Sequence, residues 1–283
     1  MAFELDRIYP GDCLELMREM PEQSVDLVLT DPPYGVTQNQ WDVPVPFEDL
    51  WAALGMVVKD RAPTVMFGIP PFSSQAIVSN PKWYRYSWIW DKHLPVGFLN
   101  ANRAPLRRYE VISVFSKKAP TYYPQKTEGS PYRKRRNTTN WNYGAYAPHE
   151  TVNEGTRYPT DIIDQFHNTA RKGDHPTQKP VGLLEYLIKT YTKPGDVVLD
   201  PFIGSGSTAV ACINTGRRFI GFELHPEYYE IAVGRVRDAQ EQARLFPSQR
   251  RAPHECHLVH RRGVDRRHRR DARDDVDDSG AVA

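Results

Sequence analysis

One stretch of the sequence decides the fold: Val25-Asp26-Leu27-Val28-Leu29-Thr30-Asp31-Pro32-Pro33-Tyr34. The apolar run at 25–30 is short enough to be a buried strand rather than a helix. Two consecutive prolines continue neither a sheet nor a helix, so the backbone leaves the sheet in a fixed, extended conformation. A carboxylate and an aromatic ring therefore stand at the carboxyl end of a strand, where open α/β sheets bind ligands. A purely structural turn explains the tetrapeptide equally well, so a second motif is needed to decide.

The composition of the whole chain limits the class of protein. With 283 residues and 40% hydrophobic content, the chain can bury one large core, or one core plus a smaller insert. No apolar run approaches the ~20 residues of a membrane span, and the first residues contain no export leader. Three widely spaced cysteines, Cys13, Cys212 and Cys256, favour a reducing cytoplasm and form no zinc-binding CxxC pair. We expect a cytoplasmic protein without a membrane segment or a metal site.

Residues 7–115 alternate between strand and helix patterns. The spacing of apolar residues predicts helices at 14–20, 47–59 and 73–78, and strands at 62–68, 84–90 and 109–115. Such alternation predicts a mostly parallel sheet with helices on both faces. The Gly11-Asp12 turn can lie at the same rim of the sheet as Asp31, but Asp12 is equally typical of a helix N-cap.

The pattern changes between residues 116 and 174, where apolar periodicity disappears. Seven basic residues and one acid, Glu128, fall between 117 and 136, a net charge of 7 − 1 = +6 in a chain whose total is +2. The basic residues are Lys117, Lys118, Lys126, Arg133, Lys134, Arg135 and Arg136, and tyrosines and Trp141 are interleaved with them or follow them. Basic side chains neutralise phosphates and aromatic rings stack on bases, so this region predicts nucleic-acid binding. A solvated loop is the alternative.

A second motif extends from residue 175 to residue 223. After His175-Pro176-Thr177-Gln178-Lys179-Pro180 come an amphipathic helix, a strand at 196–200, a glycine-rich loop at 201–208, a helix, and a strand ending at Glu223. Gly204 and Gly206 let the backbone approach a ligand, and Glu223, 223 − 204 = 19 residues further on, is placed to accept from ribose hydroxyls. The third glycine of a dinucleotide site is absent, so an adenosine ligand without phosphates fits better. A structural glycine turn is the alternative.

Residues 248–283 have a different composition. They contain no aromatic residue, nine arginines and seven acids, and cannot bury a core. We expect a disordered, charged tail there, and its histidines and Cys256 lack the spaced partners of a metal site.

Four motifs together resemble the amino-methylating DNA methyltransferases of the β group. They are Asp-Pro-Pro-Tyr at 31–34, His-Pro-Thr-Gln-Lys-Pro at 175–180, Asp-Pro-Phe-Ile-Gly-Ser-Gly-Ser-Thr at 200–208 and Gly-Phe-Glu at 221–223. Each motif alone is weak, but the combination is specific and covers residues 5–245. The family often has His-Glu where this chain has Tyr109-Glu110.

The resemblance implies the α/β fold of an S-adenosylmethionine-dependent methyltransferase. Its Rossmann-like sheet has seven strands, one of them antiparallel. It divides the chain into a catalytic half (1–115), a target-recognition insert (116–174), a cofactor-binding half (175–247) and the tail (248–283). The implied catalytic residues are Asp31, Pro32, Pro33 and Tyr34. The implied cofactor-binding residues are Asp12, Cys13, Lys179, Asp200, Phe202, Gly204, Gly206, Thr208 and Glu223.

The resemblance also implies a reaction, the methylation of adenine N6 in double-stranded DNA. An aspartate at the first motif position favours adenine, whereas Ser-Pro-Pro-Tyr is commoner among cytosine enzymes. N4-cytosine methylation, methylation of RNA or of a protein amide, and a catalytically silent DNA-binding relative are the alternatives. A homodimer and a companion restriction endonuclease are compatible with the family, and the sequence decides neither.

Overall fold

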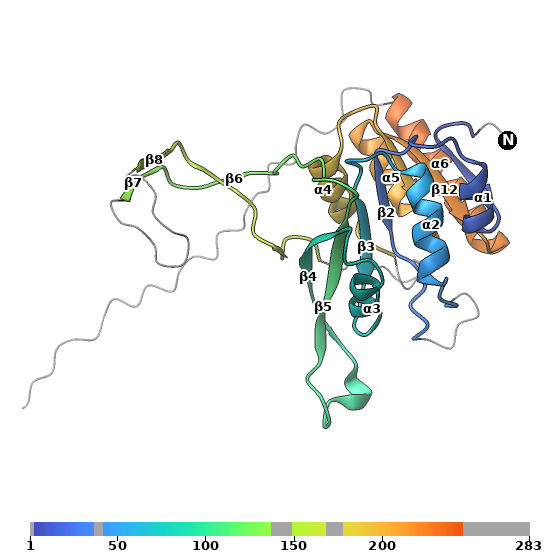
Figure 1. Cartoon of the computed structure of the whole chain (residues 1–283), viewed down its shortest axis with the longest axis horizontal. Coiled ribbons are helices and arrows are strands. Elements are labelled where there is room, and N and C mark those ends of the chain that lie inside the picture. The colour runs from blue at the N-terminus through green and yellow to red at the C-terminus, as the bar shows by residue number, and fades with distance from the viewer. Residues whose placement is uncertain (1–2, 37–41, 137–148, 168–177, 246–283) are drawn as a thin grey trace, which may run out of the picture. The chain divides into compact units, whose positions relative to one another are not determined.

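A computed structural model describes residues 3–36, 42–136, 149–167 and 178–245 (Figure 1). These residues belong to one compact unit, 1–251, while a second unit, 252–283, lies outside the described residues. The predicted tail, Trp141 and the first half of the 175–180 motif also fall outside them.

The main sheet has eight strands in the order β1-β12-β11-β2-β3-β5-β4-β10. Their bounds are β1 Arg7–Pro10, β2 Leu27–Thr30, β3 Thr64–Gly68, β4 Tyr84–Val96, β5 Arg107–Phe115, β10 Ile162–Ile163, β11 Val197–Asp200 and β12 Arg218–Glu223. Every pairing is parallel except those of β5 with β3 and β4. The predicted α/β class and the one antiparallel strand are therefore confirmed.

The predicted count of seven strands is wrong by one strand, because β10 comes from the region assigned to the insert. Ile162 and Ile163 pair with Ile89 and Trp90 of β4, and Ile163 is buried. Two residues are too few to show a strand periodicity, so the sequence pattern cannot reveal this strand.

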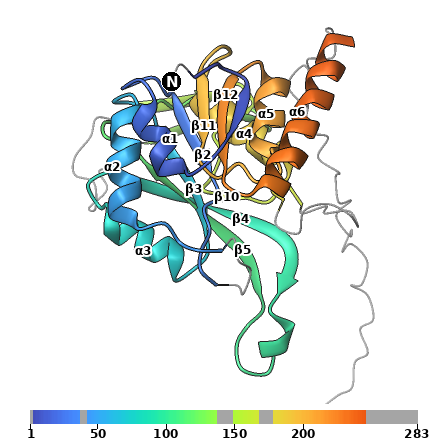
Figure 2. The ribbon, with the colours of Figure 1, turned by 90° about the vertical axis from the view of Figure 1, so that its right-hand side faces the viewer.

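Helices cover both faces of the sheet (Figures 1 and 2). Their bounds are α1 Cys13–Glu19, α2 Phe47–Val57, α3 Phe72–Ser79, α4 Val181–Tyr191, α5 Ser207–Thr215 and α6 Pro226–Leu245. Helices α1–α3 pack in one hydrophobic cluster and α4–α6 in another. In β2, Leu27 and Leu29 belong to the second cluster and Val28 to the first, as the two-residue period of a strand requires. None of the described helices is long and apolar enough to span a membrane.

The region between β5 and α4 contains two short antiparallel ladders. Strand β6, Thr127–Glu128, pairs with β9, Thr156–Arg157, and β7, Tyr132–Arg136, pairs with β8, His149–Asn153. All five strand residues of β7 are polar or aromatic, which explains why apolar periodicity does not predict it.

The carboxyl ends of four neighbouring parallel strands form one edge of the sheet. Strand β2 ends before Asp31, β11 ends at Asp200, β12 ends at Glu223, and β1 is followed by Gly11. The amide of Gly11 donates to the Glu223 carbonyl at 2.9 Å, which joins the ends of the neighbouring strands β1 and β12. The fold therefore gathers the predicted motifs at one edge.

Candidate active site

The Asp-Pro-Pro-Tyr loop is held by a buried carboxylate that the sequence pattern does not single out. Asp42 accepts from the amides of Tyr34 and Gly35 at 2.7 and 2.8 Å, and from that of Val36 at 2.9 Å. Gly35 has φ +69°, a backbone conformation that residues with a side chain rarely adopt. The Tyr34 ring packs 4.8 Å from the Phe72 ring, and its hydroxyl donates to Asp31. The loop is consequently fixed at both its backbone and its ring.

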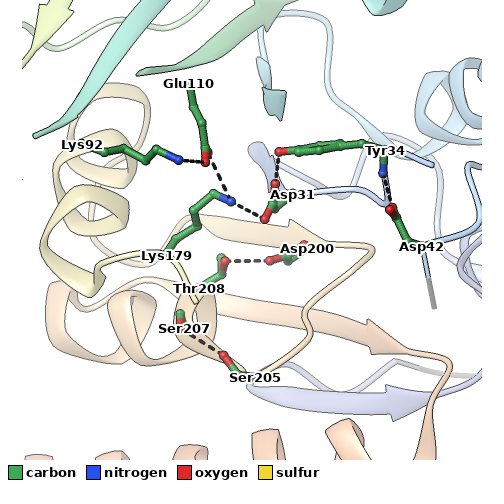
Figure 3. Close-up of polar contacts among 10 residues, drawn as sticks. All are labelled: Asp31, Tyr34, Asp42, Lys92, Glu110, Lys179, Asp200, Ser205, Ser207 and Thr208. Atoms are coloured by element: carbon green, nitrogen blue, oxygen red, sulfur yellow. Dashed lines mark hydrogen bonds and ion pairs between the residues drawn. The ribbon is translucent and has the colours of Figure 1, made fainter. Parts of the chain in front are cut away.

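Asp31 is the last of four side chains of alternating charge that lie in a row, Lys92, Glu110, Lys179 and Asp31 (Figure 3). The Lys179 ammonium binds Asp31 Oδ2 and lies 3.4 Å from Glu110 Oε2. The Lys92 ammonium donates to Glu110 Oε1 at 2.9 Å. Each charge except Asp31 is about 90% buried, with 10–11% of the side chain exposed, whereas 26% of the Asp31 side chain remains exposed. Asp31 is therefore the one of these four charged residues that a ligand can reach.

Burial and charge oppose each other in this cluster. Burial raises the pKa of Asp31, and the Lys179 ammonium opposes that rise. Burial would also raise the pKa of Glu110, but Lys179 and Lys92 outweigh it and lower that pKa. Burial lowers the pKa of Lys179, while Asp31 and Glu110 outweigh it, so Lys179 remains cationic. The two lysines favour the ionised form of both carboxylates in a poorly solvated place, and at Glu110 they outweigh burial.

The glycine-rich loop begins at a second buried carboxylate. Asp200 accepts from the Thr208 hydroxyl at 2.6 Å and from the Phe202 amide at 3.2 Å. Burial raises the pKa of Asp200 to about 7, although these two hydrogen bonds lower it. Arg235 of α6 holds the other end of the loop, donating to Ser205 O at 2.6 Å and to Gln178 at 3.2 Å.

The two glycines of this loop have different surroundings. A Cβ on Gly204 would meet only Phe202 O, at 4.0 Å, so Gly204 leaves open space beside the loop. A Cβ on Gly206 would lie 3.2 Å from Ala232 of α6. Gly206 is not among the residues that line the pocket, because the side on which a Cβ would stand faces Ala232, and its role in cofactor binding stays a prediction.

Glu223 and Asp12 lie at the far side of the loop. Glu223 accepts from the amides of Gly204 and His225, both at 2.9 Å, and burial raises its pKa. Asp12 caps α1 by accepting from the amides of Leu14 and Glu15 at 2.8 and 3.1 Å. The N-cap alternative is thus confirmed, and Asp12 also lines the pocket.

One pocket of about 700 Å³ joins these parts. Every predicted catalytic and cofactor-binding residue except Gly206 lines it, namely Asp12, Cys13, Asp31, Pro32, Pro33, Tyr34, Lys179, Asp200, Phe202, Gly204, Thr208 and Glu223. An adenosine ligand with a cationic centre fits this lining, because Gly204 leaves room along the loop and the carboxyl groups of Asp31 and Asp200 line the pocket. Burial raises the pKa of the Cys13 thiol to about 12, so this cysteine lines the pocket as an uncharged thiol.

The predicted DNA-binding residues separate into two groups. Lys117 donates to the carbonyls of Gly55 and Val58 at 2.7 and 2.9 Å, and Lys118 pairs with Asp60 at 2.6 Å. Both lysines follow Phe115, which pairs with the first residue of β3, so they lie at the sheet edge opposite Asp31. The structure does not bring these two to the pocket.

The second group lies on the short ladders. The Lys126 ammonium lies over the Tyr158 ring, 4.5 Å from the ring centroid. Arg133 Nε lies 3.6 Å from Glu150 Oε1, and 71% of the Arg133 side chain is exposed. Lys134 and Arg135 of β7 are exposed, and the side chain of Arg136 is not among those described.

Sequence reasoning missed several site residues. In the sequence, Glu110 stands out only as part of Tyr109-Glu110, where the family often has His-Glu, while Lys92 and Asp42 belong to no local motif. The only feature of the sequence that marks these three residues is a charged side chain next to an apolar strand or a loop. Such side chains are common on any protein surface. Among the described residues, no group of three or more His, Cys, Asp or Glu forms a metal site.

Comparison with solved structures places the fold among S-adenosylmethionine-dependent DNA methyltransferases. The crystal structure of the M1.HpyAVI-SAM complex matches 81% of this chain and 98% of its own, with 26% identity and a TM-score of 0.57. PvuII DNA methyltransferase, described as cytosine-N4-specific, matches 83% of this chain and 91% of its own. That likeness, with 18% identity and a TM-score of 0.59, concerns the fold.

The sequence comparisons give the family. The family described as DNA methylase, which covers N6 and N4 enzymes, matches residues 25–234. The type II methyltransferase M.BglII of Bacillus subtilis is 27% identical over 277 residues, 86% of this chain and 72% of that protein. This chain therefore belongs to the N6/N4 DNA methylase family. It is a DNA methyltransferase whose cofactor is S-adenosylmethionine.

Proposed function

We propose that this enzyme methylates the N6 amino group of adenine at a specific site in double-stranded DNA. The observation that carries the proposal is that Asp31, the first residue of Asp-Pro-Pro-Tyr, and the loop after Asp200 line one pocket. Adenine is favoured because the motif begins with aspartate, whereas the cytosine enzymes that the sequence resembles more often begin with serine.

The chemistry requires a nucleophilic amine. The lone pair of an exocyclic amine is delocalised into the base, so the amine reacts poorly until that lone pair is recovered. The Asp31 carboxylate and the Pro32 carbonyl accept the two amino hydrogens and favour a pyramidal nitrogen. The bound cofactor supplies a cationic sulfonium that carries the methyl group. Asp12, Phe202, Gly204, Thr208 and Glu223 would hold the cofactor, because they line the pocket on the side of the glycine-rich loop.

Asp31 then removes a proton. The nitrogen becomes cationic once it is methylated, so a carboxylate is a competent acceptor. Burial raises the pKa of Asp31 and makes it a stronger base, while the Lys179 ammonium favours its ionised form before the reaction. We therefore assign Lys179 to the catalytic carboxylate rather than to the cofactor.

The target base has to leave the duplex to reach this pocket. Tyr34 is the residue on which it stacks, because the Tyr34 ring lines the pocket and is held against Phe72. Residues 116–174 remain the proposed recognition region, apart from Ile162 and Ile163 of β10 in the main sheet. Its phosphate-binding side chains are those of Lys126, Arg133, Lys134 and Arg135.

The test is incubation of the purified protein with S-adenosylmethionine and unmethylated genomic DNA, followed by nucleoside mass spectrometry and modification sequencing. N6-methyladenine at one short motif is the expected result. N4-methylcytosine would retain the mechanism and contradict the choice of base. No modified base, despite confirmed cofactor binding, would contradict the proposal and favour RNA, another substrate or a silent DNA-binding protein.

A further inference from the structure

Strands β4 and β5 extend past the rest of the sheet. Strand β3 ends at Gly68, opposite Val111, whereas the pairing of β4 with β5 continues to Val96 and Arg107. Figure 2 shows these two strands leaving the sheet and closing in a turn. Residues 97–105 of that turn are all exposed, and we call them the hairpin tip.

The hairpin tip presents large apolar side chains to solvent. Phe98 is 68% exposed and Leu99 is fully exposed, at 102%. The turn that carries them is closed by backbone hydrogen bonds, from Asn100 N to Gly97 O at 2.9 Å and from Ala104 N to Asn100 O at 3.0 Å. Neighbouring exposed apolar side chains on an ordered turn indicate a contact site.

The base of the hairpin is part of the pocket wall. Leu94, Val96 and Arg107 line the same pocket as Asp31. Because Val96 is only two residues from Phe98, the hairpin tip begins at the rim of the pocket that receives the target base.

The charge of the hairpin favours DNA as its partner. Arg103 and Arg107 are exposed, and neither forms an ion pair with another residue in the described part of the chain. The two acids at the base of the hairpin are already paired, Asp91 with Arg108 and Glu110 with Lys92. A second copy of the chain is disfavoured, because two side chains cover far less than the ~800 Å² that each partner of a stable dimer buries.

We propose that Phe98 and Leu99 insert into the DNA stack where the target base has left it, while Arg103 contacts a nearby phosphate. Apolar side chains that enter a base step offset the cost of unstacking and prevent the base from returning. The inference rests on the proposed function in one respect, the extrusion of a base from duplex DNA.

The test compares two substrates that contain the recognition site. One is a fully paired duplex, and the other carries an abasic site opposite the target base, which makes extrusion easy. The double variant Phe98→Ala/Leu99→Ala should lower kcat/KM about tenfold on the paired duplex and less than about twofold on the abasic duplex. Arg103→Ala should weaken binding to both substrates and reduce the salt slope by about one.

Val78→Ala is the matched control, because Val78 is 77% exposed on α3 and does not line the pocket. It should leave both values unchanged, and all variants should retain the wild-type Tm. An equal loss on both duplexes, or no loss on the paired one, would overturn the proposed insertion of Phe98 and Leu99 (the wedge) and leave the proposed function standing. A double variant that dissociates from dimer to monomer would show a contact between copies and overturn it as well. Wild-type protein that methylates neither duplex would overturn the proposed function together with the wedge.

Discussion

The ammonium of Lys179 bridges two carboxylates, binding Asp31 Oδ2 and lying 3.4 Å from Glu110 Oε2. Residues 31, 110 and 179 come from three separate segments, so the fold alone creates this contact. It links the residue proposed to activate the target amine with a buried ion pair on β4 and β5.

Removal of the Lys179 charge should alter the pH dependence of the reaction. Burial raises the pKa of Asp31 and Lys179 opposes it, so Lys179→Met should raise that pKa further. Since the ionised carboxylate is the active form, the acidic limb of the single-turnover rate should move to higher pH. Lys179→Arg, which keeps the charge, should largely retain the wild-type profile. An unshifted acidic limb in the Met variant would contradict this role.

Glu110 should contribute stability that depends on pH. Its pKa is lowered from 4.5 in the folded protein, so its contribution is present above about pH 4.5 and is lost as the pH falls through the folded value. Glu110→Gln should reduce the free energy of unfolding by about 3 kcal/mol at pH 7, because it removes the carboxylate that pairs with buried Lys92 and leaves Lys179 with Asp31 alone. Urea titrations at pH 7 and pH 4 check this, and a difference that does not shrink at pH 4 would be inconsistent with it.

The two loop glycines should respond differently to alanine. Gly206 has φ +79°, and a Cβ there would lie 3.2 Å from Ala232, so Gly206→Ala should cost about 2 kcal/mol and several degrees of Tm. Gly204 has φ +51° with open space, so Gly204→Ala should cost about 1 kcal/mol and weaken cofactor binding more than stability. Calorimetry with and without cofactor separates the two, and a reversed order would contradict the geometry.

Only one group of the basic residues should matter for DNA. Arg135 is exposed on β7, so Arg135→Ala should lower DNA affinity and reduce the salt slope by about one. Lys118, paired with Asp60 at the opposite edge of the sheet, is the matched control. Lys118→Ala should leave the affinity unchanged in a salt titration, and equal effects of the two variants would contradict the assignment.

Much of the fold is predictable from local pattern. The buried strand at 27–30 and the helix at 47–57 follow from apolar spacing and from the prolines that bound them. Strand β10 does not, because a pair of isoleucines acquires its role only by pairing with β4. Strand β4 runs to Val96 rather than to residue 90 because it continues as a hairpin whose polar residues hide the pattern.

The same division applies to the site. Asp31, Asp200 and Glu223 are predictable because each ends or follows an apolar strand in a parallel sheet, and such ends meet at one edge. Lys92, Glu110 and Asp42 are not, since their contacts span long sequence separations or depend on the path of a loop. Gly206 shows the converse, where a correct motif includes a residue that serves helix packing.

The measurement that tests the account most directly is the activity of Asp31→Ala, with Asp31→Asn as the isosteric variant. Methyl transfer, DNA binding and cofactor binding should be measured on the same folded preparations. We predict a loss of transfer of about a thousandfold or more, with DNA binding largely unchanged. Retained activity, or an equal loss of transfer and DNA binding, would contradict the assignment of Asp31 as the group that activates the target amine.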